Sequence, residues 1–214
     1  MRRHFPIAQL LLLAFLPCTR AAESSVAFID VNVIPMNQEQ VLQRQTVIIK
    51  KGRIIEIGHV DNVKVPRKAL KIDGRDRYLM PGLTGLHVHI KGGARGNPAL
   101  LTLYAANGVT TVLNMEGFPY HLRLRDDVAS GKMFGPRIFT VGLILGGRLN
   151  PKTYERAVDA VQRQVEMGFD FIKVYSFLSP EGFRGVMDEA QRSGVPAVVP
   201  AVRSVPFDTI LIPG

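Results

Sequence analysis

The feature that most constrains the fold of this chain is a fivefold alternation of strand-like and helix-like segments after Pro81. Apolar runs that predict strands lie at 83–90, 109–114, 137–141, 170–175 and 197–201. Three of the helices between them are expected to begin at Asn97-Pro98, Asn150-Pro151 and Ser179-Pro180, where a capping side chain precedes a proline. Such alternation with short connections predicts a parallel sheet with helical crossovers, which is either closed as a barrel or open and doubly wound.

The segment before this alternating part has a period of two. Apolar residues recur at every second position from Val26, and Lys51-Gly52 joins two apolar runs in the way a tight hairpin does. The sequence therefore predicts a small all-β segment over 23–80, followed by an α/β part over 81–214.

The first 22 residues have the features of an export signal. A basic start with Arg2 and Arg3 precedes an apolar core over 7–16, and Ala21 offers a small residue for a signal peptidase. The core is too short to span a bilayer, which takes about 20 residues. We therefore expect a signal peptide over 1–22 and export of the chain, to a bacterial periplasm or as a secreted protein.

Cysteine usage and charge exclude two other classes of protein. Cys18 is the only cysteine and lies in the expected signal, so the exported chain has neither a disulfide nor a thiolate metal ligand. An exported protein without disulfides fits a bacterial envelope. The net charge is +9 at pH 7, but basic residues are scattered among acidic ones. Because no basic run is interleaved with aromatic residues, a nucleic-acid partner is not expected.

Two histidines stand two residues apart at the end of the first strand of the α/β part. Side chains alternate across a strand, so His87 and His89 are expected to point to the same face. Two imidazoles on one rigid face supply half of a tetrahedral metal site. Alone, the pair favours metal only weakly over two structural histidines at a strand end.

The residues around this pair resemble the amidohydrolase superfamily. The motifs that carry the resemblance are Lys71-Ile72-Asp73-Gly74-Arg75, Tyr78-Leu79-Met80-Pro81-Gly82-Leu83, His87-Val88-His89, Gly108-Val109-Thr110-Thr111-Val112 and Gly168-Phe169-Asp170-Phe171-Ile172-Lys173-Val174-Tyr175. Gly117-Phe118-Pro119 and Gly135-Pro136-Arg137 are similar to secreted members related to imidazolonepropionase and to Xaa-Pro dipeptidases. The resemblance covers roughly 26–199, and the ordered series is more specific than any single motif.

That resemblance implies a TIM-like (β/α) barrel with a small β-sandwich beside it. It implies a hydrolase that cleaves a carbon–nitrogen bond in a small-molecule amide, cyclic amide or dipeptide with metal-activated water. His87 and His89 would hold a divalent metal, for which zinc suits the ligands best. Lys173 would be the family's carboxylated lysine that bridges two metals, provided that burial lowers its amine pKa. The residue-based alternative is a lysine that reaches solvent at a strand end.

Other polar residues are given structural roles. His121 follows Pro119 near a helix start and is expected to be a cap or an exposed side chain, and His59 a surface residue. Asp170 precedes a strand and is expected to act as a cap or to form part of a turn. No residue of the chain is assigned a catalytic role beyond the metal ligands.

The sequence departs from the family pattern in three respects. Gly85 stands where an acidic residue usually precedes the histidine pair. Pro200 or Ala201 stands where a metal-binding histidine is expected after the fifth strand, and no histidine follows His121. The residues after Pro81 are far fewer than the about 250 of a complete barrel. We therefore expect an incomplete barrel of about five of eight units, truncated after the fifth barrel strand, with open edges.

Two hypotheses on function stay open at this point. The first is a metal-dependent amidohydrolase in which His87, His89 and Lys173 are the metal-binding residues. The second is a catalytically inactive relic, or a half-barrel that binds a partner or forms a homo-oligomer through its open edge. The family resemblance favours hydrolysis, whereas the missing fifth-strand ligand favours inactivity for the chain as written.

Overall fold

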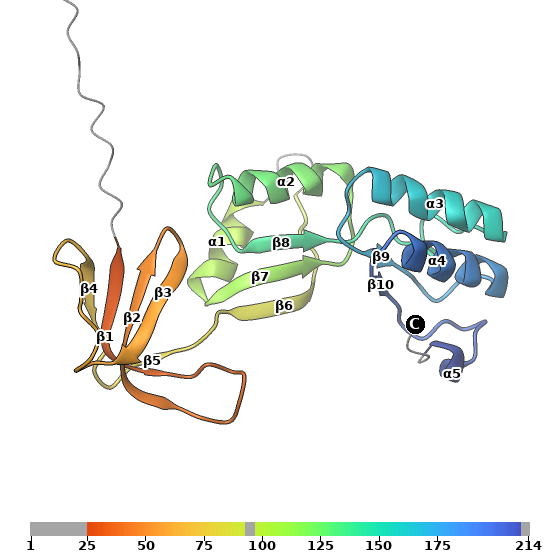
Figure 1. Cartoon of the computed structure of the whole chain (residues 1–214). Helices are drawn as coiled ribbons and strands as arrows, with labels where there is room; N and C mark the ends of the chain where they lie inside the picture. Colours follow the sequence, from red (N-terminus) through yellow and green to blue (C-terminus); the bar gives the residue numbers. More distant parts are fainter. Residues whose placement is uncertain (1–24, 93–96, 211–214) are drawn as a thin grey trace, which may run out of the picture. The chain divides into compact units, whose positions relative to one another are not determined.

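The computed structural model describes residues 25–92 and 97–210, and the expected signal peptide lies outside these residues. The chain divides into two compact units, the first ending at Pro81 and the second beginning at Gly82 (Figure 1). None of the helices in the described part is long and apolar enough to cross a membrane.

The first unit is a five-stranded sheet built around a central strand, β1. Its strands are β1 (Val26–Val33), β2 (Leu42–Lys50), β3 (Arg53–His59), β4 (Leu70–Asp73) and β5 (Tyr78–Leu79). β1 pairs antiparallel with β2, and β2 pairs antiparallel with β3. On its other side β1 pairs in parallel with β4 and β5.

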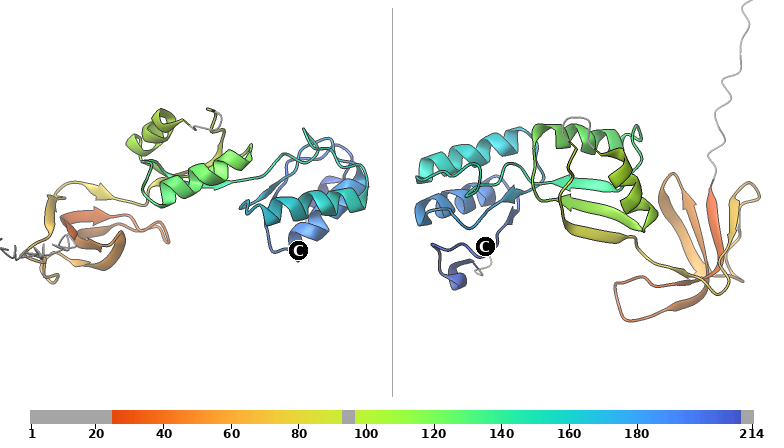
Figure 2. Two further views of the ribbon diagram at one scale, coloured as in Figure 1. Left: turned by 90° about the horizontal axis from the view of Figure 1, so that it is seen from above. Right: turned by 180° about the vertical axis from the view of Figure 1, so that it is seen from behind.

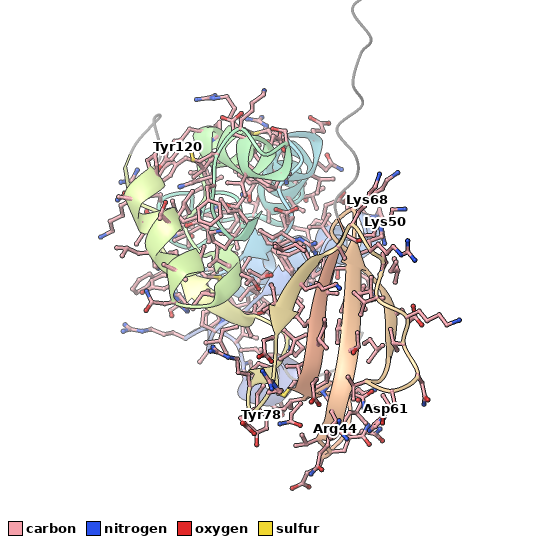
Figure 3. The ribbon with its side chains drawn as sticks, turned by 90° about the vertical axis from the view of Figure 1, so that its left-hand side faces the viewer. Arg44, Lys50, Asp61, Lys68, Tyr78 and Tyr120 are labelled. Carbon is pink, nitrogen blue, oxygen red and sulfur yellow. The ribbon has the colours of Figure 1, made fainter. Side chains whose placement is uncertain are left out.

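The turn between β2 and β3 confirms the predicted hairpin. Lys51 and Gly52 have φ angles of 53° and 70°. Positive φ at both central positions is the turn geometry that matches the twist of two antiparallel strands. Lys50 lies at this end of the sheet, and Arg44 lies at the opposite end (Figure 3).

The regular alternation predicted for β1 is interrupted at Asp30. Asp30 has a φ of 58°, and the pairing with β2 shifts register between Phe28 and Val31, which is the mark of a β-bulge. The Asp30 carboxylate accepts a hydrogen bond of 3.1 Å from Nε of Arg44 on the partner strand. Val31 then resumes the pattern and packs into the buried core of the sheet.

A buried hydroxyl in β2 gives a test of this core. Thr46 has 0% exposure, and its Oγ1 lacks a hydrogen-bond partner among the described residues. Thr46→Val keeps the shape and removes an unpaired polar atom, so we expect the free energy of unfolding to rise by about 1 kcal/mol. Urea denaturation followed by circular dichroism measures this change. A fall of the same size would show that the hydroxyl is paired in solution.

The second unit contains five parallel strands, which are β6 (Leu83–Val88), β7 (Val109–Asn114), β8 (Arg137–Thr140), β9 (Ile172–Lys173) and β10 (Ala197–Val198). β6, β7 and β8 form one sheet in that order, and β9 pairs with β10. A parallel bridge from Val141 to Phe171 joins the two sets. Neighbours in space therefore follow the order of the chain, as in a (β/α) barrel, whereas a doubly wound sheet reverses order at a switch point. The strand order decides between the two predicted closures.

The helices of the second unit are α1 (Pro98–Ala106), α2 (Pro119–Ala129), α3 (Tyr154–Glu166), α4 (Pro180–Arg192) and a short α5 (Phe207–Ile210). Two predicted caps are confirmed, since the side chains of Asn97 and Ser179 accept hydrogen bonds from the third residue of their helices. The start predicted at Asn150-Pro151 was wrong. A turn closed by a bridge between Leu145 and Leu149 precedes it, and helix α3 begins only after Thr153, whose hydroxyl is the cap.

Along each strand, one residue faces the helices and the next faces the opposite side of the strand series. Val112 of β7 packs with Leu101 of α1 and Leu124 of α2. Leu113, the next residue, belongs to a separate cluster with Phe139 and Phe171, and this cluster defines the inner face of the strand series. α3 and α4 lie side by side and pack with β9 (Figure 2). The inner face corresponds to the interior of a barrel.

Candidate functional site

His87 and His89 lie at the carboxyl end of β6 with their rings side by side. The ring centroids are 5.5 Å apart, and the planes are inclined by 37°. Val88 and Ile90 pack on the helix side, so the two rings project from the inner face. Both histidines are exposed. The predicted common face is therefore confirmed, and both imidazoles are accessible to a ligand.

Glu116 lies beside this pair, and it was not among the predicted site residues. Its Oε2 is 3.5 Å from Nδ1 of His89. β6 and β7 are parallel and pair Val88 with Asn114, so their carboxyl ends meet at one edge. An acidic residue two positions beyond β7 was the signal that could have indicated Glu116. A carboxylate at Nδ1 is a common support for a histidine that binds metal through Nε2.

The structure explains how Gly85 departs from the family pattern. A Cβ atom at Gly85 would meet side-chain atoms of Val88, Val112 and Val109 at 3.1 Å, 3.6 Å and 3.8 Å. The register of β6 shifts between Gly85 and Val88, so position 85 faces the apolar helix side while His87 faces inward. An acidic side chain at position 85 would be buried among valines. The carboxylate beside the histidines belongs to Glu116 instead.

Lys173 is buried in β9, with 7% of the residue exposed. Its neighbours Ile172 and Val174 pack against α3 and α4, so the lysine side chain projects from the inner face that carries the histidine pair. Burial lowers the pKa of the Lys173 amine below its usual value. The alternative of a lysine that reaches solvent was therefore wrong. The neutral amine favoured by this environment is the form that can react with carbon dioxide.

A buried asparagine connects the carboxyl ends of β6, β7 and β8. Asn114 has 0% exposure, and its Oδ1 accepts a hydrogen bond of 2.9 Å from the backbone N–H of Ile90. Its Nδ2 donates to the carbonyl oxygen of Glu116 at 2.9 Å and to Oγ1 of Thr140 at 3.1 Å. All the hydrogen bonds of this amide therefore lead to strand ends or to the segment that carries Glu116.

His121 holds the same part of β6 from helix α2. It is 1% exposed, its Nδ1 accepts from the N–H of Phe118 at 3.0 Å, and Nε2 therefore carries the proton that it donates to the Ile90 carbonyl at 2.8 Å. Burial lowers the pKa of His121. The predicted cap is confirmed, whereas the predicted alternative of an exposed side chain was wrong. Both ring nitrogens are engaged, so His121 is not a metal ligand in this arrangement.

Asp170 extends this polar network to the start of the fourth strand. Its carboxylate accepts from the N–H of Thr140 at 2.8 Å and from the guanidinium of Arg125 at 3.0 Å. Both contacts are structural, and neither is the cap or turn that the sequence predicted. The ends of four neighbouring strands are thus joined by side-chain hydrogen bonds.

The described residues fit a divalent metal as part of a donor set. His87 and His89 supply two nitrogen donors of the type that zinc prefers, and Lys173 would supply oxygen donors only after carboxylation. Within residues 25–92 and 97–210, no three histidine, cysteine, aspartate or glutamate residues are grouped so that they could hold an ion. Pro200 and Ala201, at the end of the fifth strand, carry no metal-binding side chain.

Sequence comparison finds curated relatives named as an allantoinase, an adenine deaminase and dihydroorotases. No family model matches the chain. The chain is 30% identical over 150 residues to an allantoinase from Arabidopsis thaliana, a match covering 64% of this chain and 28% of the relative. It is 33% identical over 67 residues to adenine deaminase 2 from Shouchella clausii, covering 31% and 12%. It is 38% identical over 47 residues to a dihydroorotase from Anaeromyxobacter, covering 22% and 10%.

Solved structures share the fold over most of the described chain. A prolidase-like protein from Bifidobacterium longum superimposes with a TM-score of 0.73 at 23% identity, covering 85% of this chain and 51% of that one. Molinate hydrolase gives a TM-score of 0.72 at 21% identity, covering 82% and 53%. A Xaa-Pro dipeptidase gives 0.66 at 23%, covering 83% and 57%. The chain spans about half the length of these structures and a smaller share of the sequence relatives.

Proposed function

Because these similarities point to the amidohydrolase superfamily, we propose that the chain supplies the first metal ligands of a hydrolase that cleaves carbon–nitrogen bonds. The observation that carries the proposal is the placement of three predicted residues on one face. His87 and His89 project side by side from the inner face of β6, and Lys173 projects from the same face of β9. The substrates that we propose are cyclic amides and Xaa-Pro dipeptides.

Each residue has a separate task in this proposal. His87 and His89 would bind a metal through neutral imidazole nitrogens. The Glu116 carboxylate, 3.5 Å from Nδ1 of His89, would accept a hydrogen bond from that nitrogen and leave Nε2 free for the metal. A divalent metal, for which we propose zinc, would supply the Lewis acidity that polarises a carbonyl oxygen and makes a water molecule acidic.

Lys173 takes part through its neutral amine. Its nitrogen forms a bond to the carbon of carbon dioxide and releases one proton, which leaves a carbamate with two oxygen donors. These two oxygens would be the oxygen donors of the site, and a two-metal site would share them. The buried position supports this role, because desolvation favours the neutral amine that must react.

We propose in addition that residues 1–22 direct export, because a basic start, an apolar core and small residues follow one another there. Fractionation of bacterial cells that express the chain with a C-terminal tag measures this. Cleaved chain in the periplasm or the medium is the expected result, and uncleaved chain in the cytoplasm would contradict it.

Chelation gives the test of the proposed function. The purified chain is stripped with a chelator, reloaded with zinc, and assayed against a panel of cyclic amides and Xaa-Pro dipeptides. We expect zinc to bind at the histidine pair and any hydrolysis to disappear on chelation and return with zinc. A chain that binds no zinc would contradict the proposal.

A second candidate function is a non-catalytic metal-binding half-barrel. It is favoured by the absence of a three-residue ligand group in the described part of the chain. It predicts that zinc binds without turnover on any substrate of the panel, and that β10 pairs with another copy. Light scattering coupled to size-exclusion chromatography distinguishes the two, because this candidate requires a mass that rises with concentration.

A further inference from the structure

We propose that Asn114 is a positioning residue for the candidate site, and that its single buried amide sets the positions of both His89 and Glu116. The inference rests on the proposed function for its meaning, since it concerns the same site. The positioning of His89 and Glu116 by Asn114 does not itself require a bound metal.

The chain on both sides of His89 is attached to the end of β7. The Val88 carbonyl accepts a hydrogen bond of 2.8 Å from the N–H of Met115, and the Ile90 N–H donates to Asn114. The regular pairing of β6 with β7 ends at Val88. The Asn114 side chain therefore continues the attachment past His89, where the ladder of backbone hydrogen bonds has stopped.

The same amide also fixes the carboxylate partner. Nδ2 of Asn114 donates to the backbone carbonyl of Glu116, whose carboxylate lies 3.5 Å from His89. One side chain thus holds the backbone next to the imidazole and the backbone of the carboxylate. The orientation of the amide is set by its partners, because the Ile90 N–H requires an acceptor and the Glu116 carbonyl requires a donor.

Burial makes this arrangement stiff. Asn114 and Thr140 have 0% exposure and Ile90 has 2%, so water cannot replace a lost hydrogen bond. His121 holds the Ile90 carbonyl from the other side. A buried polar network in which each group is paired rigidifies its surroundings, and an unpaired member is costly.

The chemistry of the side chain predicts a graded series. Asn114→Asp keeps the acceptor for the Ile90 N–H but loses the N–H groups that donate to the Glu116 carbonyl and to Oγ1 of Thr140, whose own proton goes to the Val141 carbonyl. Asn114→Leu loses the acceptor as well as these donors. We therefore expect the position of His89 to be best fixed in wild type, less well fixed in Asn114→Asp and least well fixed in Asn114→Leu.

The experiment uses the full chain with labelled histidine and has two readouts. In the metal-free protein, NMR is expected to show one sharp set of ring signals for His87 and His89, with a cross-peak between the rings. In Asn114→Leu we expect several or broadened His89 signals and loss of the cross-peak. Zinc affinity by calorimetry is expected to fall roughly 10- to 100-fold in Asn114→Leu, and less in Asn114→Asp.

The control is Thr46→Val, which changes an equally buried polar residue in the first unit and is expected to leave both readouts unchanged. Unchanged histidine signals and zinc affinity in a folded Asn114→Leu chain would overturn the inference. If that variant does not fold, unchanged His89 signals in Asn114→Asp would overturn it. If wild type binds no zinc, the proposed function fails, while the metal-free spectra still decide the role of Asn114.

Discussion

Replacing His87 or His89 with asparagine is expected to weaken zinc binding by more than about 100-fold, because each change removes a direct ligand and not only a supporting group. The stability of the metal-free chain should be nearly unchanged, since both side chains are exposed and surface substitutions usually alter stability by less than about 0.5 kcal/mol. Calorimetric titration with zinc and urea denaturation measure the two effects separately.

His59 provides the matched control for this prediction. The side chain of His59 is 41% exposed and lies 3.3 Å from the carboxylate of Asp61, whereas that of His89 is 41% exposed and lies 3.5 Å from Glu116. His59→Asn therefore removes an exposed histidine next to an acid, without touching the candidate site. Equal losses of zinc affinity in His59→Asn and His89→Asn would show that zinc binds non-specifically to surface histidines.

Replacing Lys173 with methionine is expected to change stability and metal binding in opposite directions. The chain should bind less zinc than wild type, because methionine cannot form the carbamate that we propose as a ligand. At a pH below the folded-state pKa of Lys173, the metal-free chain should become more stable by on the order of 1 kcal/mol, because a desolvated charge is then replaced by an apolar side chain of similar length. Metal analysis, and NMR with labelled bicarbonate to detect the carbamate carbon, measure the first effect.

The stability effect has a definite dependence on pH. The ordinary pKa of a lysine amine is 10.5, and burial lowers the pKa of Lys173 in the folded state. Between these two values the unfolded chain binds more protons than the folded chain, so wild-type stability falls as the pH drops through this window. The advantage of Lys173→Met should therefore be largest below the lowered pKa of the folded state, decrease as the pH rises through the window, and vanish above about pH 10.5.

Lys132 serves as the control, because its side chain is 76% exposed. Lys132→Met should leave zinc binding unchanged and give no stability advantage with this pH dependence. An advantage of Lys173→Met that is equal at pH 7 and at pH 11 would show that the lysine amine is not desolvated in the folded chain.

The parts of the fold that were predicted correctly depend on local chemistry. The Asn97 and Ser179 caps and the Lys51-Gly52 turn each follow from a few adjacent residues, and each is present in the structure. The start of α3 was misplaced because a turn just before the predicted start, closed between Leu145 and Leu149, delays the helix. The residues at the predicted helix start carry no pattern that indicates this bridge.

The candidate site was predictable only in part, for the same reason. The common face of His87 and His89 follows from strand alternation, and that expectation is confirmed. The contacts of Glu116 and Asn114 join residues on different strands, and the shift of register after Gly85 reverses the face on which an acid at that position would lie. These features are decided by how neighbouring strands pair, and the order of residues along one strand does not predict that pairing.

The burial of Lys173 likewise depends on packing. The sequence places it between Ile172 and Val174, two apolar residues, but a strand end can reach solvent or be covered. The packing of α3 and α4 against those neighbours covers β9 and leaves the lysine desolvated. The lowering of its amine pKa is therefore a property of the folded unit.

X-ray absorption at the zinc edge, on the full chain loaded with one equivalent of zinc, tests the central claim most directly. We expect a first shell of nitrogen and oxygen at about 2.0–2.1 Å with the outer-shell scattering of two imidazoles, and loss of that scattering in the His87→Asn, His89→Asn double variant. Failure of the wild-type chain to retain zinc, or a spectrum that does not change in the double variant, would contradict the account.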